Sequence, residues 1–211
     1  MTKNLSRAPS SGVDPYVDRE TEQKLVARLR EADAAAFDQV YELFRARLFG
    51  FLVRLSKRQD VAEDLLQETW IRLATKAAEL RPDTHLAAWL FTVARNLFIS
   101  YRRWRLLDAN RVQELSRVQI LAEGPDCPFE SVAAGELELR LEQALASLPL
   151  QYREVILLVA IEEISPAAVA EICGLKPAAL RKRLSRARKL LAKKLNQKTP
   201  GLYPVVSEAK A

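Results

Sequence analysis

The order of apolar and polar side chains along the chain predicts helices almost throughout. From Glu20 to about Leu107, apolar residues recur at spacings of three and four, which is typical of amphipathic helices. One clear break interrupts this pattern at Arg81–Thr84, where a proline and short polar residues end one helix and start another. Helical spacing weakens after Asp108 and resumes near Leu137. The pattern therefore predicts two separate helical segments.

These two segments define the domains that we expect in an all-α protein. Residues 19–107 and 136–196 are predicted to be helical domains, joined by a flexible linker at 108–135. Within that linker, Gly124–Pro128 cannot be helical. The two ends of the chain are interpreted as a disordered leader and a disordered tail, at residues 1–18 and 197–211.

One predicted helix of the first domain combines an apolar stripe with an acidic remainder. Val61, Leu65 and Leu73 belong to the stripe. The polar positions of the same helix are Asp60, Glu63, Asp64, Gln67 and Glu68. Because the helix dipole favours acidic side chains near the N-terminus, the residues alone favour an ordinary solvated face.

The segment between Asp83 and Asp108 contains no acidic residue and mixes arginines with aromatic residues. Arginines neutralise phosphates, and exposed rings stack on unpaired bases at about 1–3 kcal/mol per base, so the mixture suits single-stranded nucleic acid. An amphipathic core helix with snorkelling arginines explains it equally well. The residues concerned are Trp89, Phe91, Arg95, Phe98, Tyr101, Arg102, Arg103, Trp104 and Arg105.

The second domain contains the pattern of a helix-turn-helix. Ser165–Pro166 predicts a helix start, Gly174 ends that short helix, and Pro177 opens a longer one. The longer helix has leucines on one face and basic residues elsewhere, and no acidic residue occurs between Glu171 and Glu208. Such one-sign charge is self-repelling unless phosphates neutralise it. We therefore favour DNA binding over a membrane-surface helix or a calmodulin-type target, which leave the preceding helix unexplained.

Composition narrows the class of protein further. The formal net charge of +6 and the pI of about 9.4 favour a polyanionic partner. His85 is the single histidine, and Cys127 and Cys173 match no metal-ligand spacing, so we expect no metal and no cofactor. We find no glycine-rich phosphate loop and no nucleophile–base pair, so we expect no enzyme activity. Two unpaired cysteines, no signal peptide and no membrane-spanning stretch predict a cytoplasmic protein.

With both domains considered, the chain resembles the extracytoplasmic-function (ECF) group of the sigma-70 family of bacterial RNA polymerase sigma factors. The segments that resemble the family's region 2 and region 4 are Ala62–Trp70, Ala88–Phe91, Ala94–Leu97, Leu148–Pro149, Arg153–Glu154 and Arg183–Arg188. The resemblance implies promoter recognition, promoter melting and transcription initiation by a subunit without chemistry of its own. The implied partners are the clamp and flap of core RNA polymerase, duplex and single-stranded promoter DNA, and an anti-sigma factor.

The resemblance also implies three binding surfaces, and it reverses the interpretation of the acidic helix as merely solvated. Core polymerase is expected to bind Asp60, Glu63, Asp64, Gln67, Glu68 and Trp70. The −10 element, with one base flipped from the non-template strand, is expected at Arg81, Asp83, His85, Trp89, Arg95, Asn96, Tyr101, Arg102 and Arg103. The −35 duplex is expected at Lys176, Ala178, Ala179, Arg181, Lys182, Arg183, Arg186 and Arg188.

Four positions depart from the family's usual pattern. Ser100 stands for an aspartate, Ala168 for a glutamate and Ala179 for a threonine, and Lys176 stands where a small polar residue usually caps the recognition helix. Because these changes remove hydrogen-bonding side chains from the expected DNA face, we expect an unusual or degenerate −35 preference. Promoter selection with reconstituted holoenzyme checks this, and recovery of the group's common −35 motif contradicts it.

Two other functions fit part of the sequence. A stand-alone helix-turn-helix regulator accounts for the second domain but leaves the acidic helix at 62–70 unexplained, and tight duplex binding without polymerase is its signature. A sigma-like decoy for an anti-sigma protein fits the departures at Ala168 and Ala179, and transcription in vitro separates it from a working sigma factor.

Overall fold

The computed structural model describes residues 19–115 and 135–196, and in these ranges it contains helices and no strand. The all-α expectation is therefore confirmed for the described residues. The chain divides between residues 121 and 122 into two compact units, called unit 1 and unit 2 below. This division falls within the linker predicted at 108–135. The predicted leader and tail lie outside the described residues.

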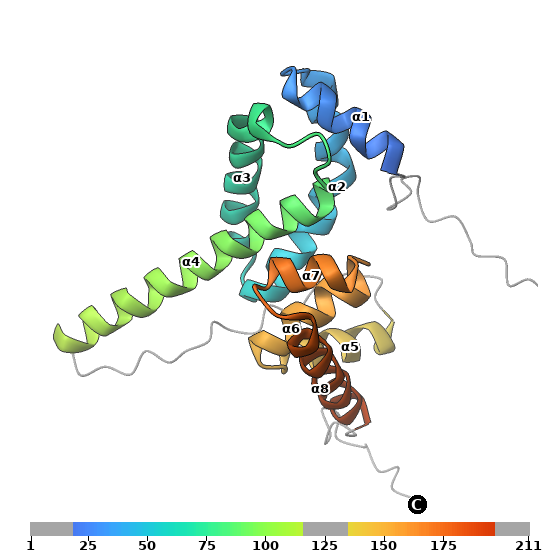
Figure 1. Cartoon of the computed structure of the whole chain (residues 1–211). Helices are drawn as coiled ribbons and strands as arrows, with labels where there is room; N and C mark the ends of the chain where they lie inside the picture. The colour runs from blue at the N-terminus through green and yellow to red at the C-terminus, as the bar shows by residue number, and fades with distance from the viewer. Residues whose placement is uncertain (1–18, 116–134, 197–211) are drawn as a thin grey trace, which may run out of the picture. The chain divides into compact units, whose positions relative to one another are not determined.

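Unit 1 is a bundle built around three long helices. Its elements are α1 (Arg19–Arg30), α2 (Ala34–Ser56), α3 (Gln59–Lys76), the 3₁₀ turn η1 (Ala77–Glu79) and α4 (Leu86–Leu115). Helices α2, α3 and α4 pack against one another, and α1 packs against α2 and η1 (Figure 1). The core includes Leu48 and Phe51 of α2, and the ring of Phe51 meets that of Phe91 edge-on at 5.2 Å between centroids.

Two sharp turns divide a stretch that the apolar pattern presents as almost continuous helix. Ala32 and Lys57 have φ angles of +59° and +58°, in the left-handed region that residues with a Cβ rarely adopt. After the first turn Asp33 caps α2, because its Oδ1 accepts hydrogen bonds from the amides of Ala35 and Ala36 at 2.9 and 3.3 Å. The prediction of a single break before Leu107 is therefore wrong, and the turns lack the glycine that would have marked them.

The cap of α2 is itself held by a charged neighbour. The Nε of Arg28 donates to Oδ2 of Asp33 at 2.7 Å, and this bond holds the pKa of the Asp33 carboxyl below its usual value. The carboxylate form is thereby favoured, which keeps the oxygen available as an acceptor for the first amides of α2.

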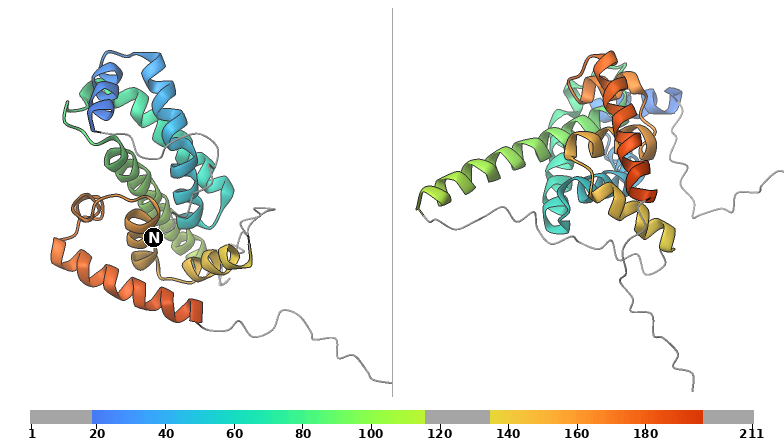
Figure 2. Two further views of the ribbon diagram at one scale, coloured as in Figure 1. Left: turned by 90° about the vertical axis from the view of Figure 1, so that its right-hand side faces the viewer. Right: turned by 90° about the horizontal axis from the view of Figure 1, so that it is seen from below.

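Helix α4 is longer than the sequence pattern predicted. It was expected to end near Leu107, where the linker begins, but it continues to Leu115. The added residues contain neither glycine nor proline and include good helix formers, so nothing in them stops the helix. The first half of α4 is anchored by buried Leu90 and Phe98, whereas every residue from Arg102 to Asp108 is exposed. The C-terminal half extends away from α1, α2 and α3 (Figure 2).

Unit 2 contains the predicted helix-turn-helix. Its elements are α5 (Glu136–Ala146), α6 (Leu150–Ile156), the π-helical turn η2 (Leu157–Ile161), α7 (Pro166–Ile172) and α8 (Pro177–Asn196), with α8 packed against α5, α6 and α7. The Oγ of Ser165 accepts the amide of Ala168 at 3.3 Å, which caps α7. Gly174, with φ of +63°, makes the turn before α8. The start of α7, the glycine turn and the start of α8 are thus where the sequence predicted them.

A buried arginine fixes the turn between α5 and α6. Arg153 is only 5% exposed, and its guanidinium donates to three carbonyls at the end of α5 and in the following turn. The acceptors are the oxygens of Leu145, Ala146 and Leu148, at 3.1, 2.7 and 2.9 Å. The last carbonyls of a helix have no partner within it, so this side chain satisfies groups that burial would otherwise leave unpaired.

Candidate protein- and nucleic-acid-binding surfaces

The acidic face of α3 is open to solvent. Asp60, Glu63, Asp64 and Gln67 are exposed, and Glu68 is half-exposed. Several of these side chains have partners on or next to α3: Glu63 accepts from Gln59 at 3.0 Å, and Glu68 from Arg72 at 2.8 Å. Such exposed pairs are weak, so a partner protein can exchange them for its own cations at little cost. We call this set the α3 acidic face.

Asp60 differs from the rest of the α3 acidic face because it is held in a bidentate ion pair. The Nε of Arg58 donates to Oδ1 of Asp60 at 3.0 Å, and a second guanidinium nitrogen pairs with Oδ2. This pairing lowers the pKa of Asp60 and raises that of Arg58. Arg58 thus neutralises the carboxylate nearest the start of α3.

Trp70 does not lie on the α3 acidic face. It is 8% exposed, and its ring contacts those of Phe37 and Tyr41, with centroids 6.1 and 5.0 Å away. Its indole Nε1 is buried without a hydrogen-bond partner among the described residues. Trp70 was predicted with the docking residues, but it lies in this aromatic cluster and offers far less surface to a partner than the α3 acidic face does. Its apolar spacing along α3 already pointed to the core.

The loop between η1 and α4 carries three of the residues predicted for the −10 element. Arg81 and Asp83 are exposed and joined through two hydrogen bonds of 3.1 Å, and the side chain of His85 is 64% exposed. The amide of Thr84 donates to the carbonyl of Arg81 at 3.0 Å and closes a tight turn. Both a cation and an anion are thus presented at the start of α4.

Along α4 itself, three predicted residues share one face. Trp89, Asn96 and Arg103 follow one another at steps of seven residues, which is two turns of helix. Trp89 is half-buried, whereas Asn96 and Arg103 are exposed. Arg95 and Tyr101 are half-buried and lie on other sides of α4, Tyr101 on the side of the buried Phe98. The arrangement offers an amide, a guanidinium and part of an indole on one side of a single helix.

The arginine–aromatic cluster between Phe98 and Arg105 is partly satisfied within α4. The guanidinium of Arg102 lies 6.0 Å from the ring centroid of Phe98, and that of Arg105 lies 6.0 Å from the ring of Tyr101. Trp104, by contrast, is 61% exposed. The structure thus contains both snorkelling arginines and an exposed ring, so the two sequence interpretations each describe part of the cluster.

Two functional candidates that the sequence did not reveal lie on α1. Glu22 is 8% exposed, and its Oε1 accepts the amide of Leu86, the first residue of α4, at 2.6 Å. Arg19 donates to the carbonyls of Asp83 and Thr84 at 2.6 and 3.2 Å. The one available signal was that Glu22 occupies a position of the apolar stripe of α1, three residues before buried Leu25. A charge there requires a specific partner.

Helix α8 presents a basic surface opposite its buried leucines. Leu180, Leu184 and Ala187 face the core. Seven of the eight residues predicted to contact the −35 duplex are exposed: Lys176, Ala178, Ala179, Arg181, Lys182, Arg186 and Arg188. Arg183 is the exception: its side chain is 25% exposed, and Nη1 lies 3.4 Å from Oε1 of the buried Glu154 in α6. Arg183 therefore holds α8 against α6 and has less freedom to reach DNA.

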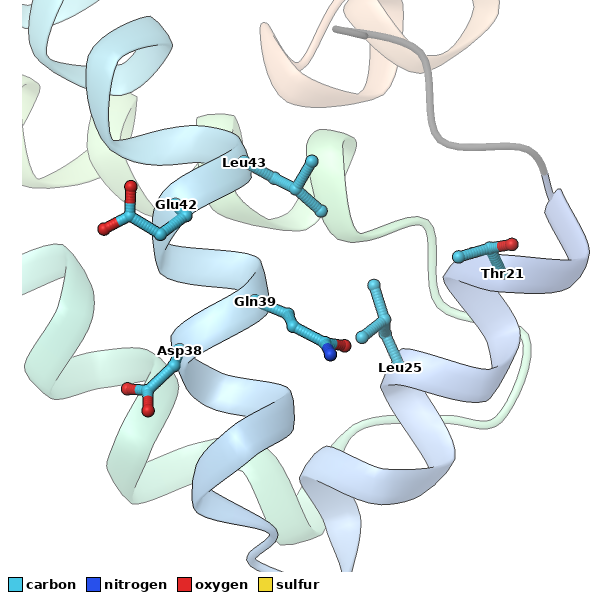
Figure 3. Close-up of a pocket in the computed structure, with 6 residues that line it drawn as sticks. All are labelled: Thr21, Leu25, Asp38, Gln39, Glu42 and Leu43. Carbon is cyan, nitrogen blue, oxygen red and sulfur yellow. The ribbon is translucent and has the colours of Figure 1, made fainter. Parts of the chain in front are cut away.

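The described residues offer little that could bind a small molecule or a metal ion. A groove of about 400 Å³ runs between α1 and α2, and Gln39 and Leu43 point into it while the carboxylates of Asp38 and Glu42 turn away (Figure 3). None of the residues predicted from the sequence lines this groove. Among residues 19–115 and 135–196, no cluster of three potential metal ligands occurs. No helix in these ranges is both long and apolar enough to traverse a lipid bilayer.

These features define an all-helical protein of two units, with an acidic face on unit 1 and a basic helix-turn-helix in unit 2. Comparison with known proteins adds the family. Sigma-70 region 2 matches residues 40–105, and Sigma-70 region 4 matches residues 138–191. The chain therefore belongs to the ECF group of the sigma-70 family of RNA polymerase sigma factors. It is a transcription initiation factor and not an enzyme.

Individual relatives agree with this assignment. The chain is 27% identical over 180 residues to the ECF RNA polymerase sigma factor SigW of Bacillus subtilis, covering 82% of this chain and 96% of that protein. It is 34% identical over 148 residues to the ECF RNA polymerase sigma factor EcfG of Rhodopseudomonas palustris, covering 69% of this chain and 77% of that protein. The sigma factor RpoE of Bartonella quintana, solved in complex with the anti-sigma factor NepR, superposes with a TM-score of 0.64 at 32% identity, covering 77% of this chain and 98% of that chain.

Proposed function

We propose that this sigma factor divides its contacts among three surfaces of the two units. The α3 acidic face docks on core polymerase. The loop at 81–85 and the exposed face of α4 hold the non-template strand of the −10 element. The basic face of α8 contacts the −35 duplex. The observation that carries the proposal is the segregation of charge, because α3 exposes carboxylates whereas α8 exposes cations and no acid.

The chemistry of each surface fits the proposed partner. Phosphates attract the cations of α8, and the second helix of a helix-turn-helix is the element that enters a major groove. A melted strand offers unpaired bases, which an exposed ring such as Trp104 can stack on. Polymerase docking needs a protein-directed surface that does not attract DNA, and an exposed run of carboxylates provides it.

Reversing the charge of the α3 acidic face tests the docking assignment. In Glu63→Lys/Asp64→Lys, both side chains are exposed, so the fold is expected to persist. Affinity for core polymerase should fall by roughly 100-fold, because a like-charge juxtaposition at an interface costs several kcal/mol. Fluorescence anisotropy of labelled sigma with purified core measures this affinity, and run-off transcription measures its consequence.

The matched control is Glu20→Lys/Glu31→Lys. It makes the same change of net charge at exposed positions at the two ends of unit 1's α1 segment, away from α3. Core affinity of the control should stay within about twofold of the wild type, since exposed surface charges and ion pairs contribute little. Equal losses in both variants, or unchanged affinity in Glu63→Lys/Asp64→Lys, contradict the docking assignment.

We infer further that the −35 contact depends more on phosphates than on base edges. Ala178 and Ala179 are exposed at the start of α8 and carry no hydrogen-bonding side chain, whereas Arg181, Lys182 and Arg186 are exposed cations. Contacts to phosphate position a protein on DNA, and contacts to base edges give sequence preference. The promoter-selection assay described above distinguishes the two.

An anti-sigma protein is proposed as a third kind of partner. The RpoE relative, of which this chain covers 98%, is in complex with such a protein. We infer that a protein antagonist binds this chain and blocks its association with core polymerase. The test adds a purified candidate antagonist to reconstituted holoenzyme components. Transcription that is undiminished at saturating antagonist rules that candidate out, and failure of every protein that copurifies with the chain rejects the proposal.

A further inference from the structure

A buried glutamate of α1 connects to the start of α4 across a separation of more than sixty residues. Oε1 of Glu22 accepts the amide of Leu86 at 2.6 Å, and Oε2 lies 2.7 Å from a guanidinium nitrogen of Arg19. Oε2 also lies 3.2 Å from Nδ1 of His85. Both carboxylate oxygens of one 8% exposed residue are therefore used at this point.

Arg19 extends the same network along the loop. Besides binding Glu22, its guanidinium donates to the carbonyls of Asp83 and Thr84 and lies 3.0 Å from Nδ1 of His85. Three consecutive loop residues are thus tied to α1. Nδ1 of His85 accepts from Arg19 when it carries no hydrogen and donates to Glu22 when it does, so the ring bonds one of the two in either form.

The start of α4 needs this support. The first amides of a helix have no partner within it, and a carboxylate placed there is favoured by the helix dipole. The residue before α4 is His85, whose ring is not a usual capping group, and it accepts the amide of Trp89 only through its backbone carbonyl. Glu22 supplies the capping oxygen from another helix.

We infer that Glu22 is a positioning residue for promoter opening: with Arg19, it fixes the loop at 81–85 and the first turn of α4 in the form that receives the −10 strand. The inference rests on the proposed role of this loop. A loop that must capture a flipped base gains affinity when its shape exists before the strand arrives, because no ordering cost is then paid on binding. Helix α1 thereby becomes part of the −10 site without touching DNA.

The experiment uses reconstituted holoenzyme containing wild type, Glu22→Ala, Glu22→Gln or the control Glu20→Ala. Glu20 is on the same helix, but its side chain is 77% exposed and pairs with Lys24. Three quantities are measured: affinity for a single-stranded −10 oligonucleotide, affinity for core polymerase, and hydrogen exchange of the Leu86 amide.

Glu22→Ala should lower oligonucleotide affinity by about tenfold, the change that one charge-assisted hydrogen bond is worth, and should speed exchange at Leu86. Core affinity should stay within about twofold. Glu22→Gln should give an intermediate loss, because it keeps an acceptor for Leu86 but no charge for Arg19. Glu20→Ala should match the wild type.

Three results overturn the inference. One is unchanged oligonucleotide affinity while exchange at Leu86 accelerates. Another is a fall in core affinity as large as the fall in oligonucleotide affinity, which identifies Glu22 as a general determinant of the fold. The third is a loss in Glu20→Ala equal to that in Glu22→Ala. If the wild-type holoenzyme does not prefer the −10 oligonucleotide over a scrambled one, the proposed function of the loop itself fails, independently of the variants.

Discussion

At the scale of single residues, three positions in the described chain adopt a left-handed backbone without being glycine. They are Ala32, Lys57 and Glu163, with φ angles of +59°, +58° and +54°. For an L-residue with a Cβ, this conformation costs about 1–2 kcal/mol of free energy. The first two lie in the turns between α1 and α2 and between α2 and α3, so both turns of the bundle contain a strained backbone residue.

Ala32 offers the simplest test of that strain. Ala32→Gly should raise the free energy of unfolding by about 0.5–1 kcal/mol, because relief of the left-handed strain exceeds the extra chain entropy of glycine. The matched control is Ala46→Gly at an exposed position inside α2, which should lower it by about 1 kcal/mol. Chemical denaturation followed by circular dichroism measures both. A loss of stability in Ala32→Gly contradicts the assigned strain.

The sequence predicts the role of a residue only when that residue acts on its immediate neighbours along the chain. Ser165 and Gly174 do, since a hydroxyl cap and a left-handed glycine act on their immediate neighbours. Glu22 and Trp70 do not, because their partners come from other helices. An acid on an apolar stripe and a tryptophan on another show only that each is buried, and not what surrounds it.

At the scale of the element, α8 combines two kinds of arginine. Arg181 is exposed, whereas Arg183 is held in the interface with α6 by Glu154. Two arginines of one helix therefore differ in their surroundings: one faces solvent, where we propose that it contacts phosphate, and the other packs against α6. The sequence showed basic residues on every face of this helix except the leucine face, and the family resemblance assigned both arginines to DNA. The contact with Glu154 could not be predicted, because its position depends on how α6 packs.

Replacing each arginine by alanine separates these purposes. Arg181→Ala should leave thermal unfolding unchanged, and the slope of log affinity against log salt for −35 duplex binding should decrease by about 0.9, the value for one phosphate contact. Arg183→Ala should lower the free energy of unfolding of unit 2 by roughly 1–3 kcal/mol, since it removes an ion pair from a buried carboxylate. Identical effects of the two variants on stability contradict the distinction.

The length of α4 illustrates a different limit of the sequence pattern. The predicted end near Leu107 followed the loss of apolar spacing, which marks where a helix stops burying one face. The helix itself continues to Leu115, because helix formers without glycine or proline need no core contact to extend an existing helix. Periodicity located the packed part of α4 and missed the part that projects beyond the bundle.

At the scale of the whole molecule, each unit has its own core. Leu48, Phe51 and Leu90 are fully buried in unit 1, and Val155, Leu158 and Leu180 in unit 2. Each set of apolar side chains is drawn from helices of one unit. The sequence predicted this division from the interruption of helical spacing between Asp108 and Leu137, where the break between units falls.

Separate cores predict separate unfolding. Leu180→Ala, at a residue 2% exposed, should destabilise unit 2 by about 2–5 kcal/mol, the usual cost of a Leu-to-Ala cavity. Hydrogen exchange in α2 and α3 of unit 1 should stay unchanged. The reciprocal variant Leu90→Ala should accelerate exchange in unit 1 and spare α6 and α8. Parallel acceleration in both units, for either variant, contradicts their independence.

The dry aromatic setting of Trp70 has an optical consequence. The chain has three tryptophans, at positions 70, 89 and 104, and all three belong to unit 1. They form a graded series from the buried indole of Trp70, through half-buried Trp89, to the exposed ring of Trp104. Indole emission shifts to shorter wavelength away from water, so fluorescence excited selectively in tryptophan reports on unit 1 alone, and unit 2 contributes no signal.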